Sequence, residues 1–160
     1  PSIGFHAALK SLAATLVLVY GKEEERAFWL LDSIVESLLP PDYFSSSLIG
    51  VRTDMRVLQS LCEKKFTKLM DHFRKLGVDL NQFSFTWLTS LFTEVLPRSV
   101  AIRVWDLLFV EGPIVLFRIP MAFLHLHVEH LLKLLSSSDV NAFLSTIGAQ
   151  VGLRGVYVSL

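Results

Sequence analysis

Apolar side chains recur at intervals of three and four residues through most of this chain, and this period constrains the fold more than any other feature. Such a period places one apolar stripe along an α-helix. An alternating pattern typical of a strand occurs only near residues 155–160. The sequence therefore predicts an all-α fold. The period is clearest at Val57, Leu58, Leu61, Phe66, Leu69, Met70 and Phe73.

Glycine and proline residues mark the ends of the first expected helices. Gly21 ends an apolar helix that begins close to the N-terminus of the sequence. The acidic run at 23–25 favours the N-terminus of a second helix, because negative charge is stabilised there. Pro40 and Pro41 must end this helix, since proline lacks the backbone N–H and restrains the preceding residue. We expect a loop over 42–50.

Two further helices are expected in the middle of the chain. The first covers 53–76, with Thr53 or Asp54 as its N-cap, since short polar side chains accept from free backbone N–H groups there. The second covers 83–96 and is apolar on most sides. A helix with this composition is typical of a central element of the core.

The last third of the chain is expected to be helical as well. Pro97 is suited to the first turn of a helix over 98–111, because its fixed φ is already helical. A long helix is expected over 114–135, with a kink or break at Pro120. A short helix over 140–149 follows, so the architecture is a multi-helix bundle.

Length, charge and hydropathy exclude several classes of function. The chain has 160 residues, enough for one domain, and its 15 acidic and 15 basic residues give zero net charge. A neutral chain does not predict binding to nucleic acid or to an anionic membrane. The apolar run Leu12–Tyr20 is far shorter than the roughly 18 residues that span a bilayer. The single cysteine, Cys62, cannot form an internal disulfide and agrees with a reducing compartment.

Polar clusters in the sequence do not form a recognisable catalytic or metal site. His125, His127 and His130 lack the HExxH order, and only the last two can share a helix face. The serine runs at 45–47 and 136–138 lack the context of a nucleophile and are typical of loops. No glycine-rich phosphate loop is present. We therefore expect no metal, no cofactor and an interaction domain instead of an enzyme.

Four segments together resemble the C-terminal half of a TBC domain, the all-helical module of Rab-type GTPase-activating proteins. They occur in the order of the family and extend over roughly residues 4–135. The resemblance implies an orthogonal helical bundle, with a partial TBC domain over 1–135 and a short helix and tail over 136–160. The segments are EEERAFWLLDSIVESLLPPDYF at 23–44, LIGVRTDMRVLQSL at 48–61, FSFTWLTSLFTEVLP at 83–97 and IRVWDLLFVEGPIVLFRIPMAFL at 102–124.

The residues in these segments are mostly expected to support the fold. The three tryptophans are expected to fill gaps between helices, and a buried indole N–H needs an acceptor. Arg103 and Asp106 are three residues apart on one helix face and can form an ion pair. Asp54 is expected to cap its helix. The residues assigned to the family pattern are Phe28, Trp29, Asp54, Trp87, Pro97, Arg103, Trp105, Asp106, Gly112, Phe117 and Arg118.

The resemblance also implies two catalytic fingers, and neither motif is present in this sequence. Family members use an arginine in Ile-x-x-Asp-x-x-Arg, which stabilises charge on the phosphoryl oxygens, and a glutamine in Tyr-x-Gln, which orients water. The first motif is absent from the 160 residues. The segment aligned with the second is residues 4–10, GFHAALK, in which Phe5 keeps the ring and Ala7 replaces the glutamine. His6 points away from the glutamine position on a helix and is not expected to substitute for it.

Three hypotheses for function follow from this resemblance. The chain is a portion of a Rab GTPase-activating protein that engages a GTP-bound Rab, promotes GTP hydrolysis in the full-length protein and regulates membrane trafficking. Alternatively, it is a TBC-like binding module without catalysis, or a helical scaffold. The location that the resemblance implies is the cytoplasm, including the periphery of endomembranes. Since the match covers half a domain, we expect the first helix to expose apolar surface that favours self-association.

Overall fold

The computed structural model describes residues 6–21 and 23–150. This part of the chain forms α-helices and one π-helical turn, and contains no strand, which confirms the all-α prediction. None of its helices is both long enough and apolar enough to cross a membrane. In chain order the elements are α1 (Ala7–Tyr20), α2 (Glu24–Ser33), η1 (Ile34–Leu38), α3 (Ile49–Lys65), α4 (Thr67–Leu76), α5 (Leu80–Thr89), α6 (Arg98–Glu111), α7 (Val115–Leu131) and α8 (Ser137–Gln150).

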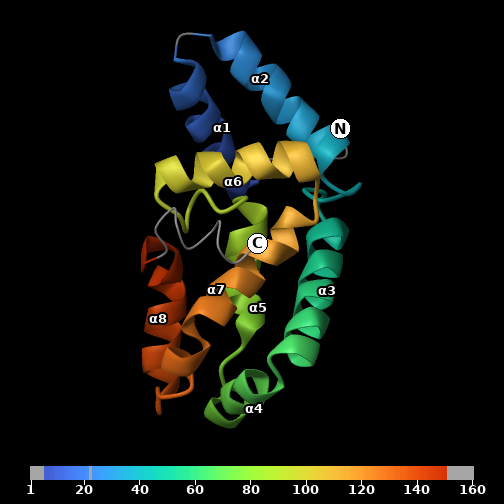
Figure 1. The fold of residues 1–160 in the computed structure, drawn as a ribbon. Coiled ribbons are helices and arrows are strands. Elements are labelled where there is room, and N and C mark those ends of the chain that lie inside the picture. The colour runs from blue at the N-terminus through green and yellow to red at the C-terminus, as the bar shows by residue number, and fades with distance from the viewer. Residues whose placement is uncertain (1–5, 22, 151–160) are drawn as a thin grey trace.

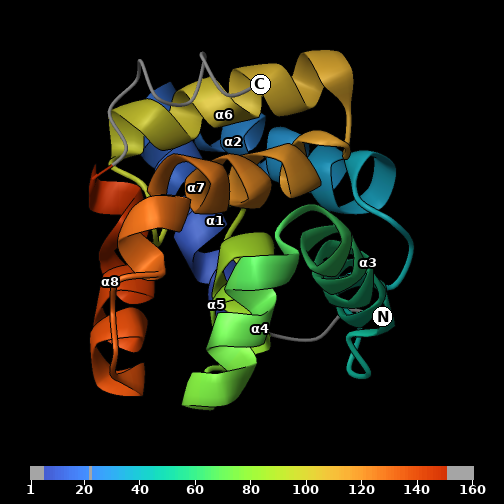
Figure 2. The same ribbon diagram turned by 60° about the horizontal axis from the view of Figure 1, so that its bottom comes forward.

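The helices surround α5, which runs through the middle of the molecule (Figure 1). α3 lies on one side of α5 and α8 on the other, and the view turned by 60° shows the same order (Figure 2). α6 lies across the upper end of this group, and the hairpin of α1 and α2 lies beyond it. The sequence predicted that the apolar helix over 83–96 is central, and α5, which contains most of this helix, does lie at the centre.

The core is organised around aromatic rings from α5, α7 and the segment between α5 and α6. Trp87 and Phe92 both meet the ring of Phe123 edge to face, with centroids 5.8 and 6.2 Å apart. All three side chains are fully buried. Edge-to-face contacts of this kind stabilise a core by about 0.5–1.5 kcal/mol each beyond the area they bury.

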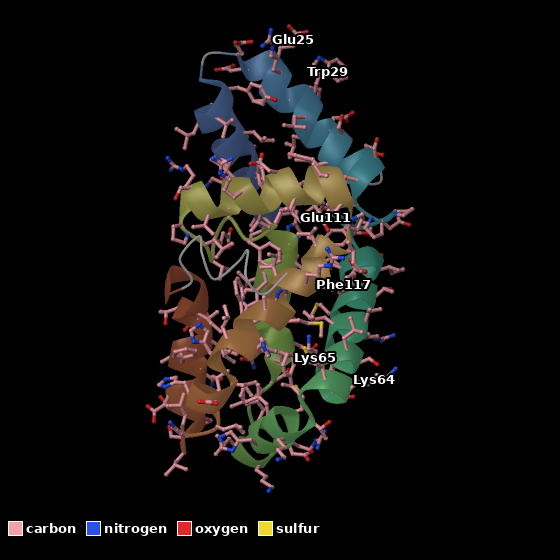
Figure 3. All side chains as sticks on the ribbon, in the orientation of Figure 1. Glu25, Trp29, Lys64, Lys65, Glu111 and Phe117 are labelled. Carbon is pink, nitrogen blue, oxygen red and sulfur yellow. The ribbon has the colours of Figure 1, made fainter. Side chains whose placement is uncertain are left out.

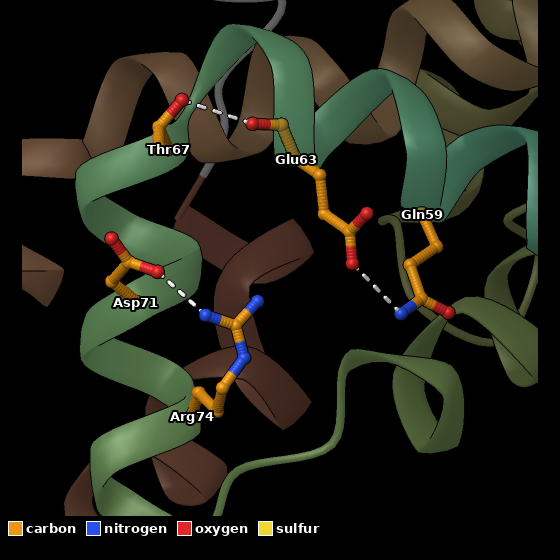
Figure 4. Close-up of polar contacts among 5 residues, drawn as sticks. All are labelled: Gln59, Glu63, Thr67, Asp71 and Arg74. Carbon is orange, nitrogen blue, oxygen red and sulfur yellow. Dashed lines mark hydrogen bonds and ion pairs between the residues drawn. The ribbon is translucent and has the colours of Figure 1, made fainter.

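The single helix expected over 53–76 is two helices that meet at Phe66. The backbone of Phe66 leaves the helical region, with φ −120° and ψ 44°, while its ring is buried. Across the junction the Thr67 hydroxyl donates to the Glu63 carbonyl, 3.0 Å away. The Gln59 amide donates to the Glu63 carboxylate (Figure 4). The periodicity continues through the bend, so the sequence pattern did not reveal it.

The bounds predicted for the helix over 83–96 are also wrong. α5 begins at Leu80, capped by the Asp79 carboxylate, which accepts from the Asn81 N–H at 2.9 Å, and it ends at Thr89. Leu91 and Phe92 then adopt left-handed backbone conformations, with φ 44° and 68°. Both side chains are completely buried. Burial of two large apolar groups offsets a backbone conformation that non-glycine residues rarely adopt.

The helix ends expected from proline and glycine are mostly observed. Leu39 is extended and stops the helix before Pro40, and Pro97 lies directly before α6. Gly112 ends α6 with φ 80°. A kink or a break was expected at Pro120, and the helix does not break there, because α7 continues through this residue from Val115 to Leu131. α8 begins at Ser137, earlier than expected.

Candidate functional site

Ala7, the residue at the expected glutamine position, is the first residue of α1 and is exposed. Its methyl group offers no hydrogen-bond donor or acceptor. A longer side chain at this position would extend from the start of a helix into solvent. Phe5, the ring residue of the same motif, lies outside the described residues.

His6 caps the N-terminus of α1, a role that the sequence analysis missed. Its backbone is extended, with φ −124° and ψ 132°, and its Nδ1 accepts a hydrogen bond from the Ala8 N–H at 3.2 Å. The imidazole ring lies against Phe44 and Phe85, with centroid distances of 5.6 and 6.5 Å. The start of α1 is thus joined to the loop before α3 and to α5.

The loop that carries Phe44 is held by two left-handed residues and a glycine. Asp42 and Leu48 have φ values of 60° and 52°. The Ser45 hydroxyl donates to the Asp42 carbonyl at 2.9 Å. A Cβ on Gly50 would lie 2.8 Å from the Tyr43 Cα, so only glycine allows α3 to approach this loop so closely. These contacts fix the surface against which His6 packs.

Asp54 does not cap α3, which corrects the sequence interpretation. It lies in the second turn of the helix and is buried, while Leu48 occupies the N-cap position. Burial raises the pKa of Asp54, and its Oδ2 has no hydrogen-bond partner in the structure. The Tyr43 hydroxyl is also buried without a partner, and burial together with the Asp54 charge raises its pKa. The helix starts earlier than predicted, which places Asp54 on its inner face.

The face of α1 that carries Ala7 continues along the helix as a stripe of small side chains. Ser11 and Ala14 follow Ala7 at helical spacing. A hollow of about 310 Å³ lies beside them, lined also by Thr93 and Arg98. The Ser11 and Thr93 hydroxyls are hydrogen bonded at 3.1 Å. The hollow beside α1 is therefore lined by small groups, hydroxyls and the guanidinium group of Arg98, and position 7 supplies no carboxamide.

The three tryptophans divide into two buried anchors and one exposed residue. Trp87 and Trp105 are buried as expected, and the Trp105 indole N–H donates to the Leu91 carbonyl at 3.0 Å. Trp29 was expected to fill a gap between helices but is 58% exposed, and Phe28 is 60% exposed. Figure 3 shows Trp29 on the outer side of α2. The periodicity did not show which side of α2 faces the core.

The charged residues of the family pattern form surface contacts in the middle of α6 and at the corner that follows it. Arg103 pairs with Asp106 at 3.2 Å, as the spacing predicted. Arg118 pairs with Glu111 across the corner at Gly112. Phe117, in the same corner, is half-buried. Each pair is substantially exposed, so its contribution to stability is small.

The histidines of α7 and the single cysteine were also considered as metal ligands or nucleophiles. Within residues 6–21 and 23–150, no group of three or more His, Cys, Asp or Glu side chains could hold a metal. His127 and His130 both lie against the ring of Phe143, and burial, with a smaller effect of His130, lowers the pKa of His127. Cys62 is fully buried, which raises the pKa of its thiol to about 12. His127 and His130 thus pack against an aromatic ring of α8, and Cys62 lies in the core.

Comparison with known proteins agrees with this fold and with the sequence motifs. A family model for the Rab-GTPase-TBC domain matches residues 1–132. The chain therefore belongs to the Rab-GTPase-TBC domain family. This family consists of GTPase activators. The assignment confirms the resemblance that the four segments indicated.

Individual relatives cover nearly all of this chain, and the chain covers a small part of them. A TBC domain-containing protein of Schizosaccharomyces pombe is 37% identical over 92% of the chain, which spans 19% of that relative. The TBC1 domain family member 2A of Bos taurus is 39% identical over 90% of the chain, which spans 16% of it. Both relatives are therefore several times longer than this sequence.

Two crystal structures share the fold. The Chlamydomonas flagellar RabGAP TBC domain superimposes with a TM-score of 0.83 at 29% identity, over 96% of this chain and 50% of the solved chain. The Ypt/Rab-GAP domain of Gyp1p superimposes with a TM-score of 0.79 over 99% of this chain and 60% of the solved chain. Its 18% identity supports the fold alone.

Proposed function

We propose that this chain is a portion of a Rab-type GTPase-activating protein that engages a GTP-bound GTPase of the Rab family. In the full-length protein it promotes GTP hydrolysis and so regulates membrane trafficking. Membership of the Rab-GTPase-TBC domain family supports the class of partner. A cytoplasmic location, including the surface of endomembranes, agrees with such a partner. In this role the chain acts as an activator of another protein's chemistry.

One observation supports a proposal for what the chain contributes to hydrolysis. Position 7 is exposed at the start of α1, where a glutamine would extend into solvent, but it is alanine. His6 beside it uses Nδ1 to cap α1 and places its ring against Phe44. Ala7 therefore has no group that could orient a water molecule, and Nδ1 of His6 is already engaged in the cap. We infer that this chain alone does not accelerate GTP hydrolysis.

The same observation favours a second candidate function, which is binding without catalysis. In this case the protein holds a GTP-bound Rab on its helical surface and does not change the rate of hydrolysis. The two functions differ only in whether the full-length protein supplies other groups that stabilise the transition state. An arginine that does so is worth on the order of a thousandfold or more in rate.

The experiment measures Rab binding and single-turnover GTP hydrolysis separately, on a panel of GTP-loaded Rab proteins. The isolated chain should bind a member of the panel without raising its hydrolysis rate. In the full-length protein, Ala7→Gln should raise the rate at unchanged affinity if the missing carboxamide limits activity. Ala14→Gln is the matched control, because Ala14 is exposed on the same face two turns further along α1. No binding to any Rab by the full-length protein would refute the proposed partner.

We also infer that the isolated chain associates with itself at high concentration. Its net charge is zero, and Val17, Leu18 and Val19 at the end of α1 are exposed. Exposed apolar groups on a neutral chain favour association. Light scattering over a range of concentrations tests this, and a monomer at every concentration would contradict it.

A further inference from the structure

The zero net charge of the chain conceals an uneven distribution of charge along it. Residues 23–42 contain six acidic residues and one basic residue, whereas α3 and α4 contain seven of the 15 basic residues and three of the 15 acidic ones. Figure 1 shows α2 at the top of the molecule and α4 at the bottom, with α3 along one edge. The acidic and basic parts are therefore separated in space, and a net charge of zero does not exclude an anionic membrane as a partner.

Most of the basic side chains of α3 lie along its outer face. A helix turns by about 100° per residue, so its exposed residues occupy about half of the circumference, opposite the buried Val51, Leu58 and Cys62. Figure 3 shows Lys64 at the end of α3 that adjoins α4. We call the exposed half of the helix the α3 outer face. Its charged and apolar members are Ile49, Arg52, Arg56, Val57, Glu63 and Lys64.

The cations of the α3 outer face stand apart from the ion pairs of the structure. In the described part of the chain, ion pairs are formed by the arginines at positions 26, 74, 103 and 118, and none involves Arg52, Arg56 or Lys64. Glu63, the acidic residue of this face, accepts a hydrogen bond from the Gln59 amide at 3.2 Å. Several unpaired cations on one face raise the local positive potential and attract an anionic surface.

Two aliphatic side chains lie among these cations. Ile49 is 59% exposed and Val57 is 41% exposed. On a membrane, the head groups neutralise basic side chains while aliphatic side chains enter the boundary of the acyl region. An acidic protein segment would neutralise the cations alone, whereas a bilayer with anionic lipids accommodates both kinds of side chain. The combination therefore favours a bilayer.

We propose that the α3 outer face is a docking surface for a membrane that contains anionic lipids. Arg52, Arg56 and Lys64 lie against the head groups, and the aliphatic side chains reach the acyl boundary. Each basic residue near such a surface strengthens binding by about fivefold. This inference rests on the proposed location at endomembranes, but binding to vesicles that carry no Rab tests it separately from the proposed partner.

The experiment measures co-sedimentation of the chain with lipid vesicles, at concentrations at which light scattering shows a monomer. The chain should sediment with phosphatidylcholine vesicles that contain about 30% phosphatidylserine, and not with phosphatidylcholine alone. Arg52→Gln combined with Arg56→Gln should weaken binding by at least about tenfold, because two cations are removed from the docking surface. Higher ionic strength should weaken the binding of the native chain.

The matched control is Arg26→Gln combined with Arg103→Gln. Both arginines are exposed, they lie on α2 and α6, and their loss changes the net charge by the same amount. This double variant should weaken binding by less than about twofold, because charges away from the contact are screened by salt. No binding of the native chain to the anionic vesicles, or an equal loss in the two double variants, would overturn the proposal.

A second pair of variants distinguishes a bilayer from a soluble acidic partner. Val57 on α3 and Val17 on α1 are 41% and 40% exposed. Val57→Ser should weaken vesicle binding several-fold, and Val17→Ser should leave it unchanged. Equal effects of these two substitutions would overturn the proposal. Binding of polyglutamate as tight as that of the vesicles, and equally dependent on Arg52 and Arg56, would identify an acidic protein as the partner and overturn it as well.

Discussion

The indole N–H of Trp105 donates to the backbone carbonyl of Leu91, 3.0 Å away, and so joins α6 to the left-handed turn after α5. Both residues are buried. A turn with two non-glycine residues at positive φ is costly in isolation and persists when its surroundings hold it. The hydrogen bond therefore shows how α6 holds the turn at Leu91 and Phe92 in place. The helical period of the sequence did not predict this turn.

Trp105→Phe should lower the free energy of unfolding by about 2–4 kcal/mol. The substitution leaves the buried Leu91 carbonyl without its donor and removes part of a packed ring. Trp29→Phe is the control, because Trp29 is exposed, and it should change stability by less than about 0.5 kcal/mol. Urea unfolding measures both. Equal effects would contradict the assignment of Trp105 as an anchor.

His6→Ala should destabilise α1 by about 1 kcal/mol, the usual cost of losing a helix N-cap. The loss removes the acceptor of the Ala8 N–H and the ring that contacts Phe44. Hydrogen exchange of the α1 amides measures the effect. His6→Asn keeps a capping acceptor and should restore much of the protection. A similar loss in both variants would show that ring packing, and not the cap, is the main contribution.

Gly50→Ala should lower the free energy of unfolding by about 1–3 kcal/mol. The added Cβ would lie 2.8 Å from the Tyr43 Cα and 3.0 Å from the Pro41 carbonyl oxygen, so backbone must move. Ser60→Ala, at an exposed position of the same helix, should have little effect. Thermal unfolding compares the two, and a neutral Gly50→Ala would indicate that the loop moves freely from α3.

Asp54→Asn should stabilise the chain at pH 7 by about 1 kcal/mol, because it removes a buried charge whose Oδ2 lacks a partner. Burial raises the pKa of Asp54 above its unfolded value of about 3.9. The folded state therefore binds the proton more tightly, and the contribution of Asp54 to stability is lost as pH rises from about 4. The difference between variant and native chain should shrink toward pH 4.

The control for this prediction is Asp32→Asn, since Asp32 is exposed on α2. Its effect on urea unfolding should be small at both pH values. An Asp54→Asn chain that is less stable than the native chain at pH 7 would show that the carboxylate makes a favourable contact.

His127 should make the chain less stable in mild acid. Burial lowers its pKa, with a smaller contribution from His130, so the unfolded state binds more protons below the unfolded pKa of about 6.5. Stability is full above that pH and decreases as pH falls through it. The effect should be well under the ~1.4 kcal/mol of a full pKa unit, because the ring is only half-buried. Unfolding at pH 7.5 and 5.5 should depend less on pH in His127→Gln, and an unchanged dependence would exclude this residue as the cause.

The helical class and most helix ends could be predicted from local chemistry. Pro40, Pro97 and Gly112 act through their own backbone, so their effects are visible in the sequence. The bend at Phe66 and the left-handed turn at Leu91 depend on burial against other helices. Those contacts are made by residues far apart in the sequence, and a periodic pattern does not contain them.

The candidate site was predictable in composition but not in geometry. The alanine at position 7 is evident from the motif, while the cap formed by His6 requires the extended backbone that precedes α1. Asp54 was misplaced because α3 begins at Ile49, several residues before the polar residues that suggested a cap. Trp29 was misplaced because the apolar period of α2 did not show which of its apolar residues face the core and which are exposed.

Pro120 lies inside α7 and has no N–H, so the Leu116 carbonyl cannot receive the usual bond from four residues later. The missing bond is a point of lower resistance to bending between two halves of one helix. The first half carries Phe117 and Arg118 beside the α6 corner, and the second carries the histidines that contact α8. We therefore expect α7 to bend more easily at Pro120 than elsewhere along its length.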